Sequence, residues 1–144
     1  MIVRAGQPLG LSCRFAYSQT YGDSTLENLG IVFDGFAATT KFFVDLGLKV
    51  LGEGPVEGGW VDRVVGLEGV RVAIAMLETP DGHGRLELME FHSPPARDGD
   101  RNAPPNTLGI PHIAFPVDDI DAAVAGLQAR GTEVLGGVEN YQDT

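Results

Sequence analysis

The feature that most constrains this fold is an internal repeat with an offset of 84 residues, in which residues 28–52 align with residues 112–136. Identical pairs include Asp34 with Asp118, Ala38 with Ala122, Gly47 with Gly131 and Leu51 with Leu135. Unmatched positions keep their apolar character. A repeat of this length indicates two copies of one supersecondary unit that share a core. We therefore expect equivalent positions of the two copies to lie around one central cleft.

The first copy is predicted to fold as a strand, a helix and three or more strands. Residues 26–33 are rich in β formers and read as a buried strand. Asp34 is expected to cap a helix whose apolar residues recur every 3.6 positions, and Gly47 is expected to end that helix. Further strands are expected at residues 48–51, 60–65, 70–77 and 85–91. A turn is expected at residues 79–82, which read Thr-Pro-Asp-Gly.

The second copy is predicted to repeat this opening after a proline-rich linker, residues 93–108. A strand is expected at residues 110–117, a helix capped by Asp118, and another strand at 133–138. The first copy continues for about forty residues beyond its matched segment, whereas the second continues for eight, 137–144. We therefore expect the second module to be incomplete.

Composition limits the class of protein. The 144 residues, 43% hydrophobic and 21% charged, suit one compact domain or two very small ones. No run of 18 apolar residues predicts a membrane helix, and the N-terminus lacks the apolar core of a signal peptide. A single cysteine, Cys13, suits a reducing cytoplasm. The net charge of −10 argues against nucleic acid as a partner and is compatible with simple solubility or with a cationic ligand.

Three segments carry a resemblance to a known family. They are Leu-Glu-Asn-Leu-Gly-Ile-Val at 26–32, Arg-Leu-Glu-Leu-Met-Glu-Phe at 85–91, and Gly-Ile-Pro-His-Ile-Ala-Phe-Pro-Val-Asp-Asp-Ile at 109–120. Their order, together with the repeat, resembles the vicinal oxygen chelate superfamily, which includes glyoxalase I, bleomycin resistance proteins and extradiol dioxygenases. The resemblance implies an α+β fold of paired βαβββ modules that form a curled mixed sheet. It divides the chain into an N-terminal extension (1–25), a first module (26–92), the linker (93–108) and a second module (109–144).

The resemblance also implies a site. In metal-dependent members the first and last strands of each module each point one ligand into a cup, where the metal binds two neighbouring substrate oxygens. Carried over by position, these ligands are Asn28, Glu87 and His112, and the fourth position lies 84 residues after Glu87, beyond residue 144. The metal implied is zinc, nickel, manganese or iron. Asn28 is a weak donor for such metals, and catalytic zinc usually has three good protein ligands.

Each candidate also has an ordinary structural interpretation. His112 is either a cleft ligand or acid–base group, or a buried histidine that hydrogen-bonds a neighbour. Glu87 faces the cup if Leu86 and Leu88 pack against the helices, and otherwise is a solvated edge charge. Asn28 is also a candidate hydrogen-bond donor to substrate. Trp60 is the aromatic residue that we expect to line the cleft.

Two main functions follow from the resemblance, since a fold alone does not fix an activity. The first is a metal-assisted lyase, isomerase or dioxygenase that acts on a small oxygen-rich molecule, with Glu87 and His112 as metal ligands and catalytic residues. The alternative is a metal-free protein of the bleomycin-resistance type that binds an antibiotic or another small molecule, which Asn28 and the net charge favour. A third possibility is an inactive copy that needs another chain to complete its second sheet. In each case we expect a cytoplasmic homodimer with no membrane or nucleic-acid partner.

Overall fold

The computed structural model describes residues 2–4, 14–16, 26–97, 99, 104, 106–110, 112–134 and 138. They belong to two compact units, Met1–Pro104 and Pro105–Thr144, and the division falls within the proline-rich linker. In the part of the chain that is described, no helix is long and apolar enough to span a membrane.

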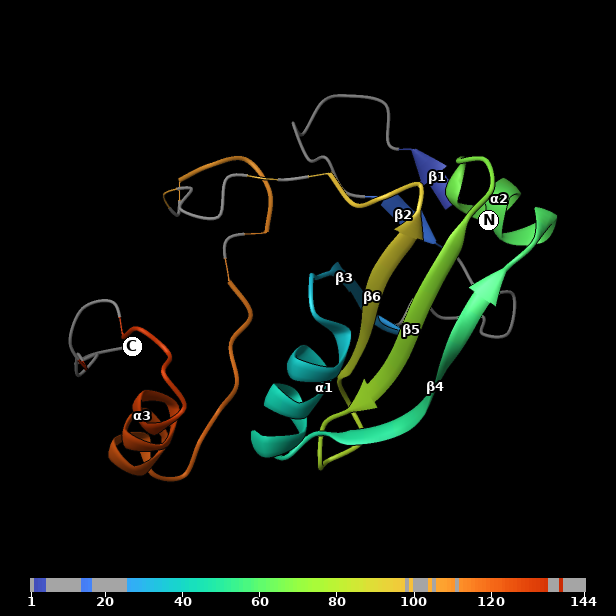
Figure 1. Ribbon diagram of the computed structural model, residues 1–144. Helices are drawn as coiled ribbons and strands as arrows, with labels where there is room; N and C mark the ends of the chain where they lie inside the picture. The colour runs from blue at the N-terminus through green and yellow to red at the C-terminus, as the bar shows by residue number, and fades with distance from the viewer. Residues whose placement is uncertain are drawn as a thin grey trace. The chain divides into compact units, whose positions relative to one another are not determined.

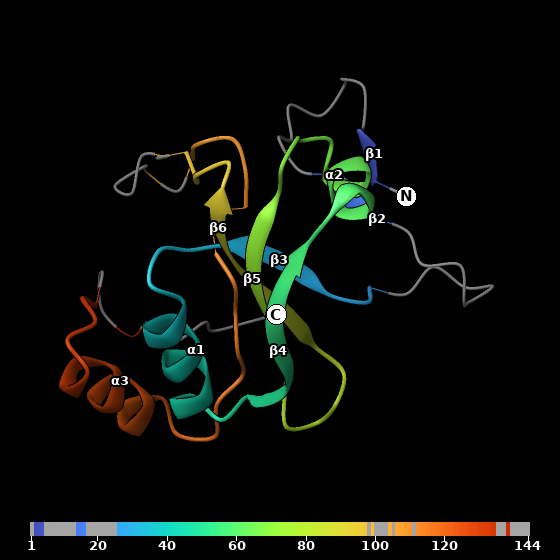
Figure 2. The ribbon, with the colours of Figure 1, turned by 45° about the vertical axis from the view of Figure 1, so that its right-hand side comes forward.

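The first unit is built on a mixed four-stranded sheet with the strand order β3-β6-β5-β4 (Figures 1 and 2). Its strands are β3 (Leu29–Val32), β4 (Lys49–Glu57), β5 (Arg71–Glu78) and β6 (Arg85–Ser93). The β3 strand runs parallel to β6, and the other neighbours are antiparallel. Two short strands, β1 (Ile2–Arg4) and β2 (Arg14–Ala16), form a separate antiparallel pair. This curled α+β sheet matches the predicted class of fold.

Helix α1 (Phe36–Asp45) packs on one face of the sheet. The alternation of β5 and β6 explains why, because Leu77 pairs with Leu86 and Ala75 pairs with Leu88, so that all four side chains share this face. Each of the four is at most 6% exposed. Burial of these side chains against the apolar stripe of α1, which includes Phe43, forms the main core.

The opposite face of the sheet, which we call the open face, is covered at one end only. There Val61 of α2 (Gly59–Val65) packs with Val70 and Val72 in a small apolar cluster. Phe91 and Met89 of β6 border the cluster on the same face. The rest of the open face carries no helix among the described residues.

The prediction of a strand at residues 60–65 is wrong, because this segment is helix α2. Its β-branched residues suggested a strand, but Val61 and Val65 lie four positions apart and both pack toward the cluster on the open face. Gly66 ends the helix in the left-handed region, with a φ of 70°. The strand expected at 48–51 is longer than predicted, since β4 continues to Glu57.

The predicted cap of the first helix is also wrong. The residue before α1 is Gly35 rather than Asp34, and no side chain caps the helix from that position. The Gly35 backbone N–H instead donates to Glu90 Oε1 of β6, at 3.0 Å. A carboxylate from the sheet therefore supplies the negative charge that a helix N-terminus favours.

The second unit contains α3 (Ile120–Ala129), whose bounds lie 84 positions after those of α1. Asp119, not the predicted Asp118, caps it, because its carboxylate accepts from the Ala122 N–H at 2.9 Å. The helix ends as α1 does: Gly131 and Gly47 have φ of 82° and 104°. The Thr132 N–H bonds the Leu127 carbonyl, as the N–H of Leu48 bonds that of Phe43. The repeat therefore extends to backbone conformation.

The strand predicted at residues 110–117 is wrong, since Ile110 and residues 112–117 lie in no strand. A strand needs a pairing partner, and the described residues of the second unit contain no strand that could pair with this segment as β6 pairs with β3 in the first unit. Pro116 also lacks the N–H that a ladder uses. Of the strand predicted at 133–138, Glu133 and Val134 are in no strand, and residues 135–137 lie outside the described part.

Candidate functional site

The structure brings Asn28 and Glu87 together at the end of the open face. The Asn28 Nδ2 donates to Glu87 Oε2 at 2.8 Å, and the bond is partly buried. Asn28 immediately precedes the start of β3, and Glu87 lies in the neighbouring β6. Leu86 and Leu88, on either side of Glu87 in β6, are buried on the face that α1 covers, so Glu87 faces the opposite way. The Glu87 carboxylate therefore belongs to the open face.

A glycine makes room for this contact. Gly30 lies opposite Glu87 in the parallel β3–β6 register. A Cβ at Gly30 would lie 3.0 Å from the Met89 Cε and 3.8 Å from Glu87 Oε2. Glycine at this position leaves the space that the Met89 methyl and the Glu87 carboxylate occupy.

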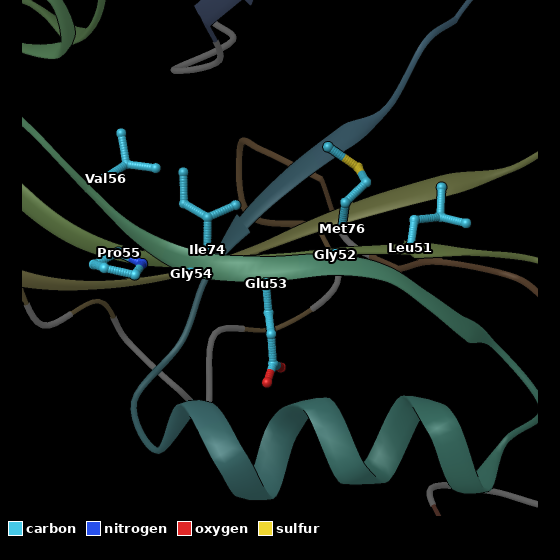
Figure 3. Close-up of a pocket in the computed structure, with 8 residues that line it drawn as sticks. All are labelled: Leu51, Gly52, Glu53, Gly54, Pro55, Val56, Ile74 and Met76. Carbon is cyan, nitrogen blue, oxygen red and sulfur yellow. The ribbon is translucent and has the colours of Figure 1, made fainter.

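An apolar hollow of about 420 Å³ lies on the same open face, over strands β4 and β5. Figure 3 shows Leu51, Val56, Ile74 and Met76 projecting from the sheet to the side opposite α1, whereas the Glu53 side chain points toward that helix. Gly52 and Gly54 also line the hollow, and a Cβ added to either one would meet no atom within 4 Å. This hollow was not predicted from the sequence, although two glycines at alternate positions of a strand are a signal that could have indicated it.

The strand register connects the polar pair to the hollow. Met76 pairs with Glu87 on one side and with Gly52 on the other, and Gly30 pairs with Glu87 beyond it. One row across all four strands therefore reads Gly30–Glu87–Met76–Gly52. The next row reads Val32–Met89–Ile74–Gly54. The open face thus has a carboxylate at one side and an apolar floor at the other.

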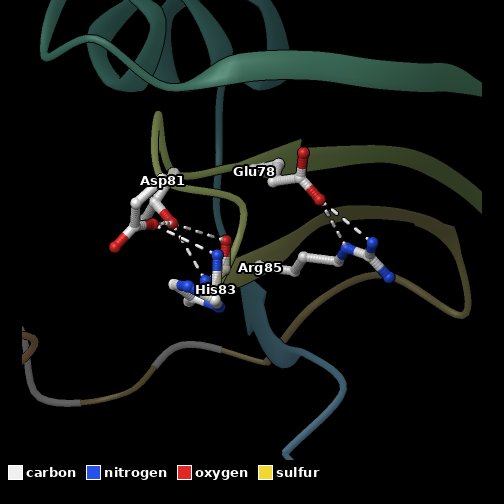
Figure 4. A network of polar contacts seen from close by, with 6 residues as sticks. Glu78, Asp81, His83 and Arg85 are labelled. Atoms are coloured by element: carbon white, nitrogen blue, oxygen red, sulfur yellow. Dashed lines mark hydrogen bonds and ion pairs between the residues drawn. The ribbon is translucent and has the colours of Figure 1, made fainter.

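Other titratable groups of the first unit have structural roles or stand apart. Figure 4 shows the turn between β5 and β6, where Arg85 forms an ion pair with Glu78 at 3.0 Å. Asp81 in the turn accepts from the Thr79 hydroxyl and from the His83 N–H. These hydrogen bonds, the first more strongly, hold the pKa of Asp81 below its ordinary value of 3.8. The network closes the turn between β5 and β6.

The remaining predicted site residues lie elsewhere. His112 belongs to the second unit, in no helix or strand, and its side chain is exposed. Trp60 lies in α2 and is 56% exposed. Its expected place beside the cleft assumed a strand at residues 60–65, and this segment is a helix. Cys13, which we did not consider reactive, lies outside the described residues.

The donor set of the first unit is too small for a metal by itself. Asn28 and Glu87 supply one amide and one carboxylate, and the described residues contain no group of three or more His, Cys, Asp or Glu side chains placed to hold a metal. Glu87 Oε1 accepts no hydrogen bond from any described residue, so this oxygen is available as a donor. Among the described residues of the first unit, Glu87 is thus the one strong metal donor of this pair, and a metal there would need further ligands.

Comparisons with known proteins decide the family. The profile of the Glyoxalase/Bleomycin resistance protein/Dioxygenase superfamily matches residues 28–144. The chain belongs to this superfamily. A crystal structure of a glyoxalase family protein from Bacillus cereus is similar to the superfamily member described here, with a TM-score of 0.80 and 39% sequence identity over 88% of this chain and 85% of that chain. The uncharacterized protein YaeR of Escherichia coli (strain K12) is 42% identical over 53 residues, which span 37% of this chain and 38% of YaeR.

Proposed function

We propose that this superfamily member is a metal-assisted lyase, isomerase or dioxygenase that acts on a small oxygen-rich molecule. The observation that supports it most is the position of Glu87, half-buried on the open face with one carboxylate oxygen held by Asn28. This is the geometry of an oriented ligand or proton acceptor rather than of a solvated edge charge.

In this proposal each residue has a distinct role. Glu87 and His112 hold a divalent zinc, nickel, manganese or iron ion, which when bound polarises neighbouring oxygens of the substrate. The Asn28 amide donates to one oxygen of Glu87 and thereby fixes the direction of the other. The Glu87 carboxylate is also the group suited to accept a proton from the substrate.

The alternative is a metal-free protein that binds an antibiotic or another small molecule. Two observations favour it: Asn28, a weak metal donor, is already engaged with Glu87, and the hollow beside the pair is apolar. The net charge of −10 would suit a cationic ligand. Binding of such a ligand with equal affinity in the presence and absence of a chelator supports this function over the first.

For the whole protein we propose a cytoplasmic homodimer. Large apolar side chains support association, among them Val50 at 40% exposed in the edge strand β4. Light scattering over a range of protein concentrations tests the proposal, and a monomer at every concentration would contradict it.

The metal is tested by elemental analysis of protein purified without chelator. We expect about one metal per chain in the wild type and little in His112→Ala and Glu87→Ala, since each removes one of two strong ligands. The matched controls are His92→Ala and Glu57→Ala, which change an exposed histidine and an exposed glutamate of the first unit. Absence of metal from the wild type, or retention of metal in both ligand variants, contradicts the proposal.

A further inference from the structure

We infer that the hollow on the open face binds an apolar substituent of the substrate, and that Gly52 and Gly54 determine which substituents fit. The inference rests on the proposed site at Glu87, because it assigns the substrate a polar end and an apolar end. The substrate class is a small molecule with neighbouring oxygens and one apolar group about the size of a branched alkyl group or a single ring.

The hollow has the size and lining of a site for such a group. The hollow is shallow and open to solvent, and its volume of about 420 Å³ leaves room for one substituent rather than for a whole enclosed ligand. The walls are Leu51, Val56, Ile74 and Met76, and Figure 3 shows their side chains on one side of the sheet.

The floor of the hollow exists because two strand positions lack side chains. Gly52 lies opposite Met76 and Gly54 lies opposite Ile74, so both glycines belong to the open face. Glycine inside a strand costs stability relative to a residue with a side chain. Neither glycine has a positive φ, and a Cβ at either would meet no atom within 4 Å. Gly52 borders an irregularity in the β4–β5 register, which can itself favour glycine. Gly54 lies in the regular part of the ladder, where neither backbone conformation nor packing in the described part requires glycine. The space above the two glycines is what their presence provides.

The hollow is continuous with the polar pair. Met76 lines the hollow and is also the cross-strand neighbour of Glu87. Neighbouring strands lie about 4.8 Å apart, so Glu87 and Gly52, two strands apart, are separated by about 10 Å along the row. A molecule with an oxygen-bearing head at Glu87 therefore reaches the glycine floor with an apolar group of modest length.

The test compares two ligands with the same head. Catechol and 4-tert-butylcatechol each offer two neighbouring hydroxyls to Glu87, and they differ by one branched alkyl group. Binding is followed by NMR with ¹³C-methyl methionine, because Met76 lines the hollow and Met89 lies in the next row. All titrations contain EDTA and a reductant, so that their outcome is independent of the proposed metal.

We expect wild-type protein to bind 4-tert-butylcatechol about tenfold more tightly than catechol, with the larger shift at the Met76 methyl. Gly54→Val fills the floor and should reduce that ratio to about one while leaving catechol affinity unchanged. Gly99→Val is the matched control, since a Cβ at Gly99 also meets nothing within 4 Å. If Gly54→Val does not fold, Gly52→Ala replaces it, with a smaller reduction expected.

Four results would overturn the inference. The first three are an equal affinity of the wild type for both ligands, an unchanged ratio in Gly54→Val, and 4-tert-butylcatechol shifts confined to Met89. A fourth is a wild-type dimer that Gly54→Val converts to a monomer in sedimentation, because the hollow would then be covered by a second copy. Glu87→Ala separates this inference from the proposed function: we expect it to weaken both ligands and to leave their ratio unchanged.

Discussion

At the scale of single residues, the surroundings of Glu87 are set by two small neighbours. Gly30 leaves the carboxylate room, and Asn28, which immediately precedes β3, donates a hydrogen bond to it. The sequence resemblance implies a metal ligand at position 28. In the structure the Asn28 side chain instead directs its amide N–H toward the Glu87 carboxylate. The side chain at position 28 therefore determines whether the Glu87 carboxylate contacts a hydrogen-bond donor or another charged group.

We predict that Asn28→Asp destabilises the protein at pH 7 by about 1 kcal/mol, because it replaces a hydrogen-bond donor with a second carboxylate at the same contact. The loss should shrink as the pH falls toward 4, since one proton shared by the two carboxylates removes the repulsion. Urea unfolding at both pH values measures it. Asn106→Asp, at an exposed turn position, is the control and should change stability little. An equal loss at both pH values would contradict the repulsion.

A second prediction concerns Asp81, whose pKa is lowered by the Thr79 hydroxyl and the His83 N–H. Because the folded-state pKa lies below the unfolded value, Asp81 stabilises the fold above its unfolded pKa, and this contribution is lost as pH falls through the folded pKa. A ¹³C titration should give Asp81 a midpoint below 3.8. Thr79→Val, which removes the first cause, should move the midpoint upward, and an unmoved midpoint would contradict this cause.

At the scale of elements, α2 shows where pattern reading fails. Its sequence, Gly-Trp-Val-Asp-Arg-Val-Val, is short and β-branched, so local propensity favours a strand. The helix forms because Val61 is buried against Val70, just before β5, and Val72 of β5, a tertiary contact that local propensity does not include. Asp62 adds to it by accepting from the Gly69 and Val70 N–H groups at 3.0 and 2.8 Å.

The helical assignment of this segment predicts unequal effects of neighbouring substitutions. Val61 is 4% exposed and Trp60 is 56% exposed. We expect Val61→Ala to cost about 2 kcal/mol of unfolding free energy, and Trp60→Ala less than about 0.5 kcal/mol despite the larger side chain removed. Denaturant unfolding measures both, and a larger loss for Trp60→Ala would contradict the packing of α2.

Elements set by local sequence were predicted correctly. Helix α1, the turn at Thr79–Gly82, and strands β5 and β6 follow from periodicity and turn residues. The ends of the two repeat-related helices also follow, since Gly47 and Gly131 are both left-handed. The errors at Asp34 and Asp118 are displacements of one residue at helix starts. The Gly35 backbone N–H donates to the Glu90 carboxylate of β6, a partner that the local sequence does not reveal.

The candidate site was also predictable only in the part that local sequence determines. Alternation along β6 places Glu87 opposite the buried leucines, so its face followed from the sequence once the leucines were assigned to the core. The donor–acceptor relation of Asn28 and Glu87 did not follow, because it depends on the β3–β6 register. The hollow depends on the β4–β5 register in the same way.

At the scale of the whole molecule, the repeat and the superfamily match describe the same organisation. The profile covers residues 28–144, which include both copies of the repeat. Each copy carries one proposed ligand, Glu87 in the first unit and His112 in the second. The account therefore predicts that neither unit binds the metal alone and that the two residues act as one site.

The most direct test of this claim is calorimetric titration of metal-free protein with Ni²⁺, for the wild type, Glu87→Ala, His112→Ala and the double variant. We predict that the wild type binds one Ni²⁺ ion per chain and that each single variant binds it at least about tenfold more weakly. The Ni²⁺ affinity of the double variant should equal that of the single variant with the lower affinity. Such non-additivity indicates a shared site. Wild-type protein that takes up no Ni²⁺, or single variants that bind it as the wild type does, would contradict the account.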